Sequence, residues 1–148
     1  MPPDQDQLGE AAEWLRYAAS DLALARVPCE APIMWETLCF HAQQAAEKAL
    51  KAVLIARAIE FPKTHSIGAL LDLLPGELAA PQDVQNAASL TEYAVLSRYP
   101  GRPEPATEEE HHEALRLAGA VVGWAEQACD ISGPAAAAAE DHPGPAGT

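Results

Sequence analysis

Residues that favour β-sheets and basic side chains are both scarce in this chain of 148 residues. It has two phenylalanines, and valine and isoleucine together number 11, against 16 leucines and 32 alanines. Because β-branched and aromatic residues favour strands whereas alanine and leucine favour helices, this composition predicts an all-α protein. Nine basic against 22 acidic side chains give a net charge of −13. Such a charge argues against a protein that covers nucleic acid or an anionic membrane with its whole surface.

Long apolar runs and closely spaced cysteines are lacking as well. No segment approaches the roughly 18 apolar residues that span a bilayer, and the start of the chain has neither the basic nor the apolar part of a signal peptide. We therefore expect a cytoplasmic protein without a membrane anchor. Cys29, Cys39 and Cys129 are too far apart in sequence to resemble a zinc site, so we expect reduced thiols and neither metal nor cofactor.

The charge is distributed unevenly along the chain. Segments 1–36 and 104–148 carry net charges of −5 and −8, whereas segment 37–103 contains six acidic and six basic side chains. A binding site for an anion is therefore predicted in this neutral middle segment. Its six cations are Lys48, Lys51, Arg57, Lys63, Arg98 and Arg102.

Apolar residues recur at helical spacing in five segments separated by prolines, glycines or polar caps. Five helices with short connections are typical of an antiparallel, up-and-down bundle, which we place at residues 8–130. Residues 1–7 are expected to be flexible, and residues 131–148, rich in alanine, proline and glycine, to form a disordered tail. The five segments run from Leu8 to Ala25, Leu38 to Ala56, Ile67 to Leu74, Val84 to about Arg98, and Thr107 to Ala128.

The second predicted helix carries a polar stripe that we define as His41, Gln44, Lys48 and Lys51. At helical spacing these four side chains fall within an arc of about 80°, beside a face of alanines. A solvated face, which every bundle helix needs, explains such a stripe without any ligand. Its mixture of imidazole, amide and ammonium donors, in the neutral part of the chain, favours an anion-binding site instead.

Three motifs in this region resemble those of the HEPN family. Residues 40–52, FHAQQAAEKALKA, resemble the family's long-helix signature, and PKTHS at 62–66 and SRYP at 97–100 follow in the family's order. An opening segment with Trp14, Asp21 and Ala25 also fits, so the resemblance covers about residues 8–130. HEPN proteins are small and all-α, and are often encoded beside a minimal nucleotidyltransferase.

The resemblance implies a helical homodimer that binds nucleotides or RNA. It further implies one component of a toxin–antitoxin or nucleotidyltransferase two-component system, with the nucleotidyltransferase encoded by a neighbouring gene. The lysines suit phosphate as point charges, an arginine can contact it bidentately, and a tyrosine can stack on a base. The matching polar residues are His41, Gln44, Lys48, Lys51, Lys63, His65, Arg98 and Tyr99.

Enzymatic activity stays open at this point. Many ribonucleases of the wider HEPN group carry an arginine, four to six intervening residues and a histidine, and this pattern is absent here. A metal-independent endoribonuclease toxin using His41 or His65 with Arg98 is one alternative, and catalytic residues are not assigned. A purely structural module, whose polar stripe is buried by a protein partner, is the other.

Several side chains also have simple structural interpretations. Glu47 is expected to pair with Lys51, four residues further along the helix. His65 is expected either to cap or shape the turn before the third helix or to contact a ligand. His111 and His112, at the acidic start of the last helix, are expected at the surface.

Overall fold

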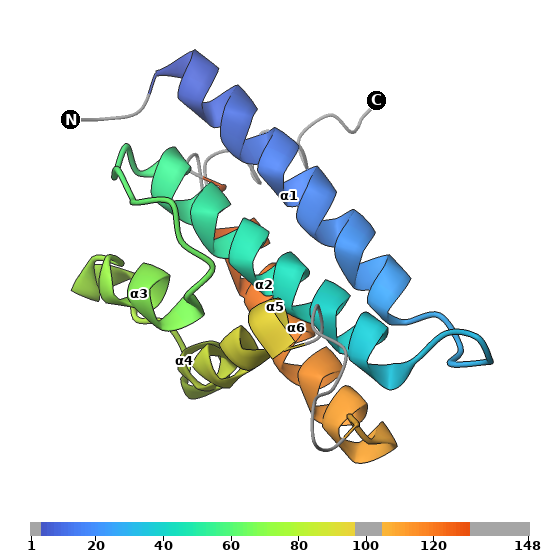
Figure 1. Cartoon of the computed structure of the whole chain (residues 1–148). Coiled ribbons are helices and arrows are strands. Elements are labelled where there is room, and N and C mark those ends of the chain that lie inside the picture. The colour runs from blue at the N-terminus through green and yellow to red at the C-terminus, as the bar shows by residue number, and fades with distance from the viewer. Residues whose placement is uncertain (1–3, 97–104, 131–148) are drawn as a thin grey trace, which may run out of the picture.

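The computed structural model describes residues 4–96 and 105–130, and every regular element within them is helical (Figure 1). Three long helices, α1 (Gln5–Ala25), α2 (Trp35–Ala56) and α6 (Glu108–Ala128), form the main part of the bundle. The predicted all-α bundle is confirmed. None of the described helices is both long and apolar enough to cross a membrane. The shorter elements are α3 (Ile67–Asp72), η1 (Gly76–Leu78), α4 (Gln82–Asn86), η2 (Ala87–Thr91) and α5 (Glu92–Leu96), with η1 and η2 being 3₁₀ helices.

The fourth predicted helix is divided into α4, η2 and α5 rather than continuous. In η2 the Ser89 hydroxyl donates to the Asn86 carbonyl at 3.1 Å, a local bond that competes with the α-helical ladder. Thr91 Oγ1 accepts from the Ile67 backbone N–H at 3.0 Å, which attaches η2 to the start of α3. The predicted end of this helix, near Arg98, and the predicted tail at 131–148 lie outside the described residues.

Side-chain caps fix where the helices begin. Asp4 and Gln7 form a capping box that starts α1 at Gln5, three residues before the predicted start. Thr107 and Glu110 form the capping box of α6, a pattern that the sequence TEEE at 107–110 indicates. Ser66 caps α3 by accepting from the backbone N–H of Ala69 at 3.1 Å.

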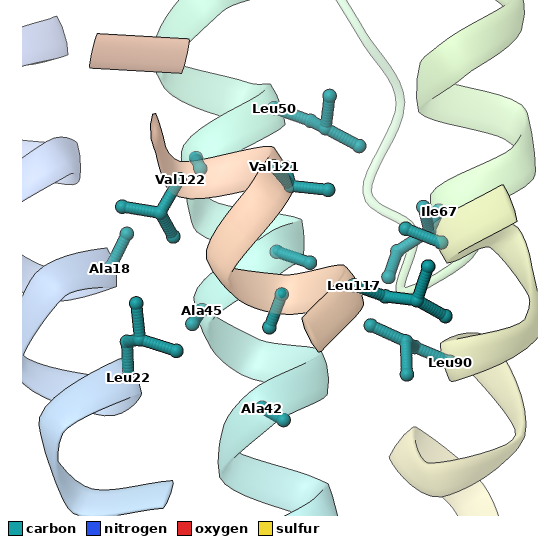
Figure 2. Close-up of a cluster of buried hydrophobic side chains, with 14 of the residues drawn as sticks. Ala18, Leu22, Ala42, Ala45, Leu50, Ile67, Leu90, Leu117, Val121 and Val122 are labelled. Carbon is teal, nitrogen blue, oxygen red and sulfur yellow. The ribbon is translucent and has the colours of Figure 1, made fainter. Parts of the chain in front are cut away.

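Helix α2 lies at the centre of the bundle, packed along α1 and α6 and against α3, η2 and α5. Fourteen of its 22 residues are buried. Figure 2 shows Ala18 and Leu22 of α1 on one side of α6, with Ile67 and Leu90 on the other. Small side chains allow neighbouring helix axes to approach closely, which brings polar residues of α1 within reach of α2. The buried alanines of α2 are Ala42, Ala45, Ala46, Ala49, Ala52 and Ala56.

His111 is buried, so the prediction that it lies at the surface was wrong, whereas His112 is exposed. The Nε2 of His111 donates to the Ala25 carbonyl at 2.8 Å, and the His111 ring centroid lies 5.0 Å from that of Trp35. His111 stands one turn before Ala114, on the apolar face of α6. It satisfies a carbonyl at the end of α1 that the helix itself leaves without a partner.

The C-terminus of α2 ends in a Schellman motif without a glycine. Ala58 has a φ of 58°, and the Ile59 N–H donates to the Leu54 carbonyl at 2.8 Å. Arg57 Nη2 donates to the Ala128 carbonyl at 3.2 Å, which joins this end of α2 to the end of α6. Arg57, one of the cations of the neutral middle segment, therefore serves helix packing.

We predict that Ala58→Gly stabilises the protein by about 1 kcal/mol, because glycine adopts a left-handed backbone without the steric cost that alanine bears. The measurement is the free energy of unfolding in urea. Ala12→Gly is the matched control, since Ala12 is exposed within α1 and the same substitution there should destabilise by about 1 kcal/mol. Equal destabilisation by both substitutions would contradict the prediction.

We predict that His111→Phe destabilises the protein by about 1–3 kcal/mol, because a ring still faces Trp35 but the Ala25 carbonyl loses its donor. His112→Phe, at the exposed neighbour, should change the free energy of unfolding by less than about 0.5 kcal/mol. Thermal and urea unfolding of the two variants provide the comparison. Equal stability of the two variants would exclude a capping role for His111.

Candidate functional site

Helices α1 and α2 lie side by side and antiparallel (Figure 1). Polar side chains of α2 belong to two clusters, one of which contains a carboxylate of α1. Asp21 of α1 is the centre of the first cluster, because its carboxylate contacts two side chains of α2. Its Oδ1 lies 3.1 Å from His41 Nδ1, and its Oδ2 lies 2.6 Å from Lys48 Nζ. His41 and Lys48 are seven residues apart on α2, about two turns, so one carboxylate reaches both. We call Asp21, His41 and Lys48 the Asp21 cluster.

Glu47 of α2 is the centre of the second cluster, and its side chain is only 4% exposed. Its carboxylate accepts from Lys51 Nζ at 2.8 Å, Gln43 Nε2 at 2.9 Å and His65 Nδ1 at 3.0 Å. The predicted pairing of Glu47 with Lys51 is confirmed. Gln44 Nε2 also donates, to Gln43 Oε1 at 2.7 Å and more weakly to Glu47 at 3.4 Å. We call these five residues the Glu47 cluster.

The pKa of Glu47 lies below the ordinary glutamate value. Burial alone would raise this pKa, but the hydrogen bonds from Lys51, Gln43 and His65, together with the positive charge of Lys51, outweigh it. Glu47 is therefore an ionised, fully engaged carboxylate at neutral pH. This arrangement favours a structural role for Glu47 over that of a general base.

Lys51 is less accessible than its place in the polar stripe suggested. It is 8% exposed, and its Nζ lies 5.8 Å from the ring centroids of both Trp14 and Phe61. Both distances allow cation–π attraction. The four residues of the polar stripe thus divide between the clusters, with His41 and Lys48 on Asp21, and Gln44 and Lys51 on Glu47.

The loop between α2 and α3 brings His65 to this face. The His65 side chain is 55% exposed, with its Nδ1 on Glu47 and its backbone carbonyl accepting from Gln43 at 3.2 Å. Ser66, and not His65, caps α3, so of the two structural roles expected for His65 only that in the turn agrees with its contacts to Gln43 and Glu47. Lys63 is exposed and makes no ion pair within the part of the chain that the structure describes. Arg98 and Tyr99 lie outside the described residues.

His41 and His65 share one feature that bears on chemistry. A carboxylate only accepts hydrogen bonds, so the Nδ1 of each ring must carry the proton in the contacts with Asp21 and Glu47. Each ring is thereby oriented, and its Nε2 is the nitrogen left to contact another group. In residues 4–96 and 105–130 no group of three or more His, Cys, Asp or Glu side chains is arranged to hold a metal ion.

Sequence reasoning did not assign Asp21 or Gln43 to the site. The signal for Asp21 was an acidic residue within the apolar stripe of the first helix, between Ala18 and Ala25. Gln43 is fully buried although its side chain is a polar amide. Each of the two residues has a partner in another segment of the chain. Gln43 donates to the His65 carbonyl, and Asp21 contacts His41 of α2.

We predict that Glu47→Gln destabilises the protein by about 3 kcal/mol at neutral pH, because it leaves the buried Lys51 charge without its partner. The folded pKa of Glu47 lies below its unfolded value of 4.5, so the stabilisation by the carboxylate is complete above pH 4.5. This contribution disappears as the pH falls through the lower folded pKa. The difference in unfolding free energy between wild type and variant should therefore shrink in acid.

Urea unfolding at pH 7 and at several pH values below 4.5 measures this difference. Glu60→Gln, at an exposed position of the α2–α3 loop, is the control and should leave the stability nearly unchanged at every pH. A difference between wild type and Glu47→Gln that is independent of pH would contradict the assignment.

Comparisons with known proteins agree with this architecture. The HEPN domain family matches residues 11–128, which is most of the chain. TT1696 from Thermus thermophilus is 36% identical, with 84% of this chain and 96% of that chain covered and a TM-score of 0.58. ST0689, an archaeal HEPN homologue, is 30% identical, and the match covers 81% of this chain and 98% of that chain with a TM-score of 0.65. No curated protein matches the chain. From the family match over these residues and the two similar structures, the chain belongs to the HEPN domain family.

Proposed function

We propose that this protein binds the phosphate groups of a nucleotide or of RNA at the face formed by the Asp21 cluster and the loop before α3. The observation that carries the proposal is a set of partly exposed polar side chains there, of which Lys48 donates to a phosphate as it stands, whereas His41 and His65 donate through Nε2 only in the protonated form of the ring. The side chains of His41, Lys48 and His65 are 24%, 27% and 55% exposed, and each is oriented by a carboxylate behind it. Such preorganised donors lose little conformational freedom when a ligand binds.

The electrostatics of this face set limits on its ligand. Asp21 and Glu47 offset the charges of Lys48 and Lys51, and the histidines add positive charge only when they are protonated. Lys63 adds a further cation, and Arg98 belongs to the same family pattern. A site with so few net charges binds one or two phosphates rather than a long polyanion, and its affinity decreases with added salt.

The biological role that we propose is that of one component of a toxin–antitoxin or nucleotidyltransferase two-component system. Support comes from membership of the HEPN family and from the three motifs at 40–52, 62–66 and 97–100. The protein is then a cytoplasmic homodimer whose partner is a minimal nucleotidyltransferase from a neighbouring gene. Co-purification of the two gene products tests this role. If substitutions of Lys48 and Lys51 abolish the protein complex rather than ligand binding, the result would favour a structural interaction module instead.

A metal-independent endoribonuclease is the second candidate, and the two histidine–carboxylate pairs favour it. His41 with Asp21 and His65 with Glu47 each combine an imidazole with a carboxylate that orients it, as a general base or acid requires. Arg98 is the proposed stabiliser of the phosphorane charge. Induced expression with cellular RNA integrity as the readout decides, because intact RNA at toxic expression levels excludes this activity.

We predict that Lys48→Ala weakens the binding of ATP and of short single-stranded RNA at low salt by about tenfold, because a charge-assisted contact to phosphate is lost. Isothermal titration calorimetry or filter binding measures the affinity. Arg116→Ala is the control, since it removes the same charge from an exposed ion pair on α6. Binding that is unchanged in Lys48→Ala, or no binding of either ligand to the wild type, would contradict the proposal.

A further inference from the structure

A pocket of about 430 Å³ lies beside the Asp21 cluster, within the roughly 300–1,000 Å³ typical of small-molecule sites. Four of its lining residues come from α1 and the fifth, Lys48, from α2. Tyr17 is 56% exposed although its ring is largely apolar, and Trp14 lies one turn before it. The pocket is lined by Glu10, Glu13, Trp14, Tyr17 and Lys48.

We propose that this pocket binds the nucleobase of the nucleotide whose phosphate lies on the Asp21 cluster. The inference rests on the proposed phosphate site. Lys48 connects the two places, because it lines the pocket and its Nζ also contacts Asp21, which holds His41. A single ligand can therefore contact Lys48 with its phosphate and the aromatic rings with its base.

The positions of the aromatic residues on α1 support a stacking surface. Trp14, Tyr17 and Asp21 are three and four residues apart, so they lie in one row along the helix. Lys51 also contacts Trp14, with its Nζ 5.8 Å from the centre of the ring. Aromatic rings on such a row accept the face of any base, since every base has a π-surface.

The two glutamates of the pocket determine which base fits best. Carboxylates only accept hydrogen bonds, so they favour a base edge with adjacent N–H donors. Guanine presents N1–H and its exocyclic amino group side by side, whereas uracil presents one N–H between two carbonyl oxygens that repel a carboxylate. Glu13 contacts Arg16 at 2.7 Å, but Glu10 makes no hydrogen bond or ion pair among the described residues. Glu10 is thus the acceptor that selects guanine over uracil.

The test compares guanosine and uridine monophosphates in calorimetric titrations at low salt. The wild type should bind the guanosine nucleotide more tightly, and Tyr17→Ala should weaken that binding by about tenfold. Tyr17→Phe, which keeps the ring, is the matched control and should retain the affinity. Glu10→Gln should reduce the ratio of the two affinities, because the amide presents a donor as well as an acceptor.

The possible failures are distinguishable. If Lys48→Ala weakens both nucleotides while Tyr17→Ala and Glu10→Gln change neither, the pocket inference is wrong and the phosphate site stands. If neither nucleotide binds to the wild type, both proposals are wrong. If Tyr17→Ala converts a dimer to a monomer in sedimentation velocity without changing nucleotide affinity, the pocket is a self-association surface and the inference is overturned.

Discussion

The buried Glu47 carboxylate is the constraint on which the polar side of this bundle depends. A charge with 4% of its side chain exposed is costly unless its hydrogen bonds are satisfied, and here α2 supplies most but not all of them. Lys51 and Gln43 come from the same helix, but His65 comes from the loop before α3. The requirement to satisfy Glu47 therefore fixes where that loop returns along α2, and with it the position of α3.

The alanine face of α2 provides the second condition for the site. Because α1 packs closely against this face, the short side chain of Asp21 reaches both His41 and Lys48, and the Trp14 ring reaches Lys51. Larger residues at these alanine positions would separate the two helices and with them the donors from their carboxylates. The alanines that allow close packing of the core therefore also keep Asp21 within reach of His41 and Lys48.

Sequence reasoning found the elements whose signals are local. The periodicity of α1, α2 and α6, the capping box at Thr107 and the pairing of Glu47 with Lys51 are all encoded within a few residues. It did not find Asp21 as the partner of His41 and Lys48, which lie 20 and 27 residues away. Periodicity indicates which face of a helix is polar, but not which element will cover it. The burial of His111 was missed for the same reason, because its partner is a carbonyl 86 residues earlier.

The paired state of the cations has a consequence for selectivity. A phosphate that approaches Lys48 must compete with Asp21, which already holds the ammonium group at 2.6 Å. An inorganic anion offers little beyond the interaction that it replaces, so such a site discriminates against simple anions. A ligand gains affinity only when it adds contacts elsewhere, and the neighbouring aromatic rings of Trp14 and Tyr17 provide the surface for them. On this argument the acidic residues of the site favour nucleotides over free phosphate, although by charge alone they would oppose both.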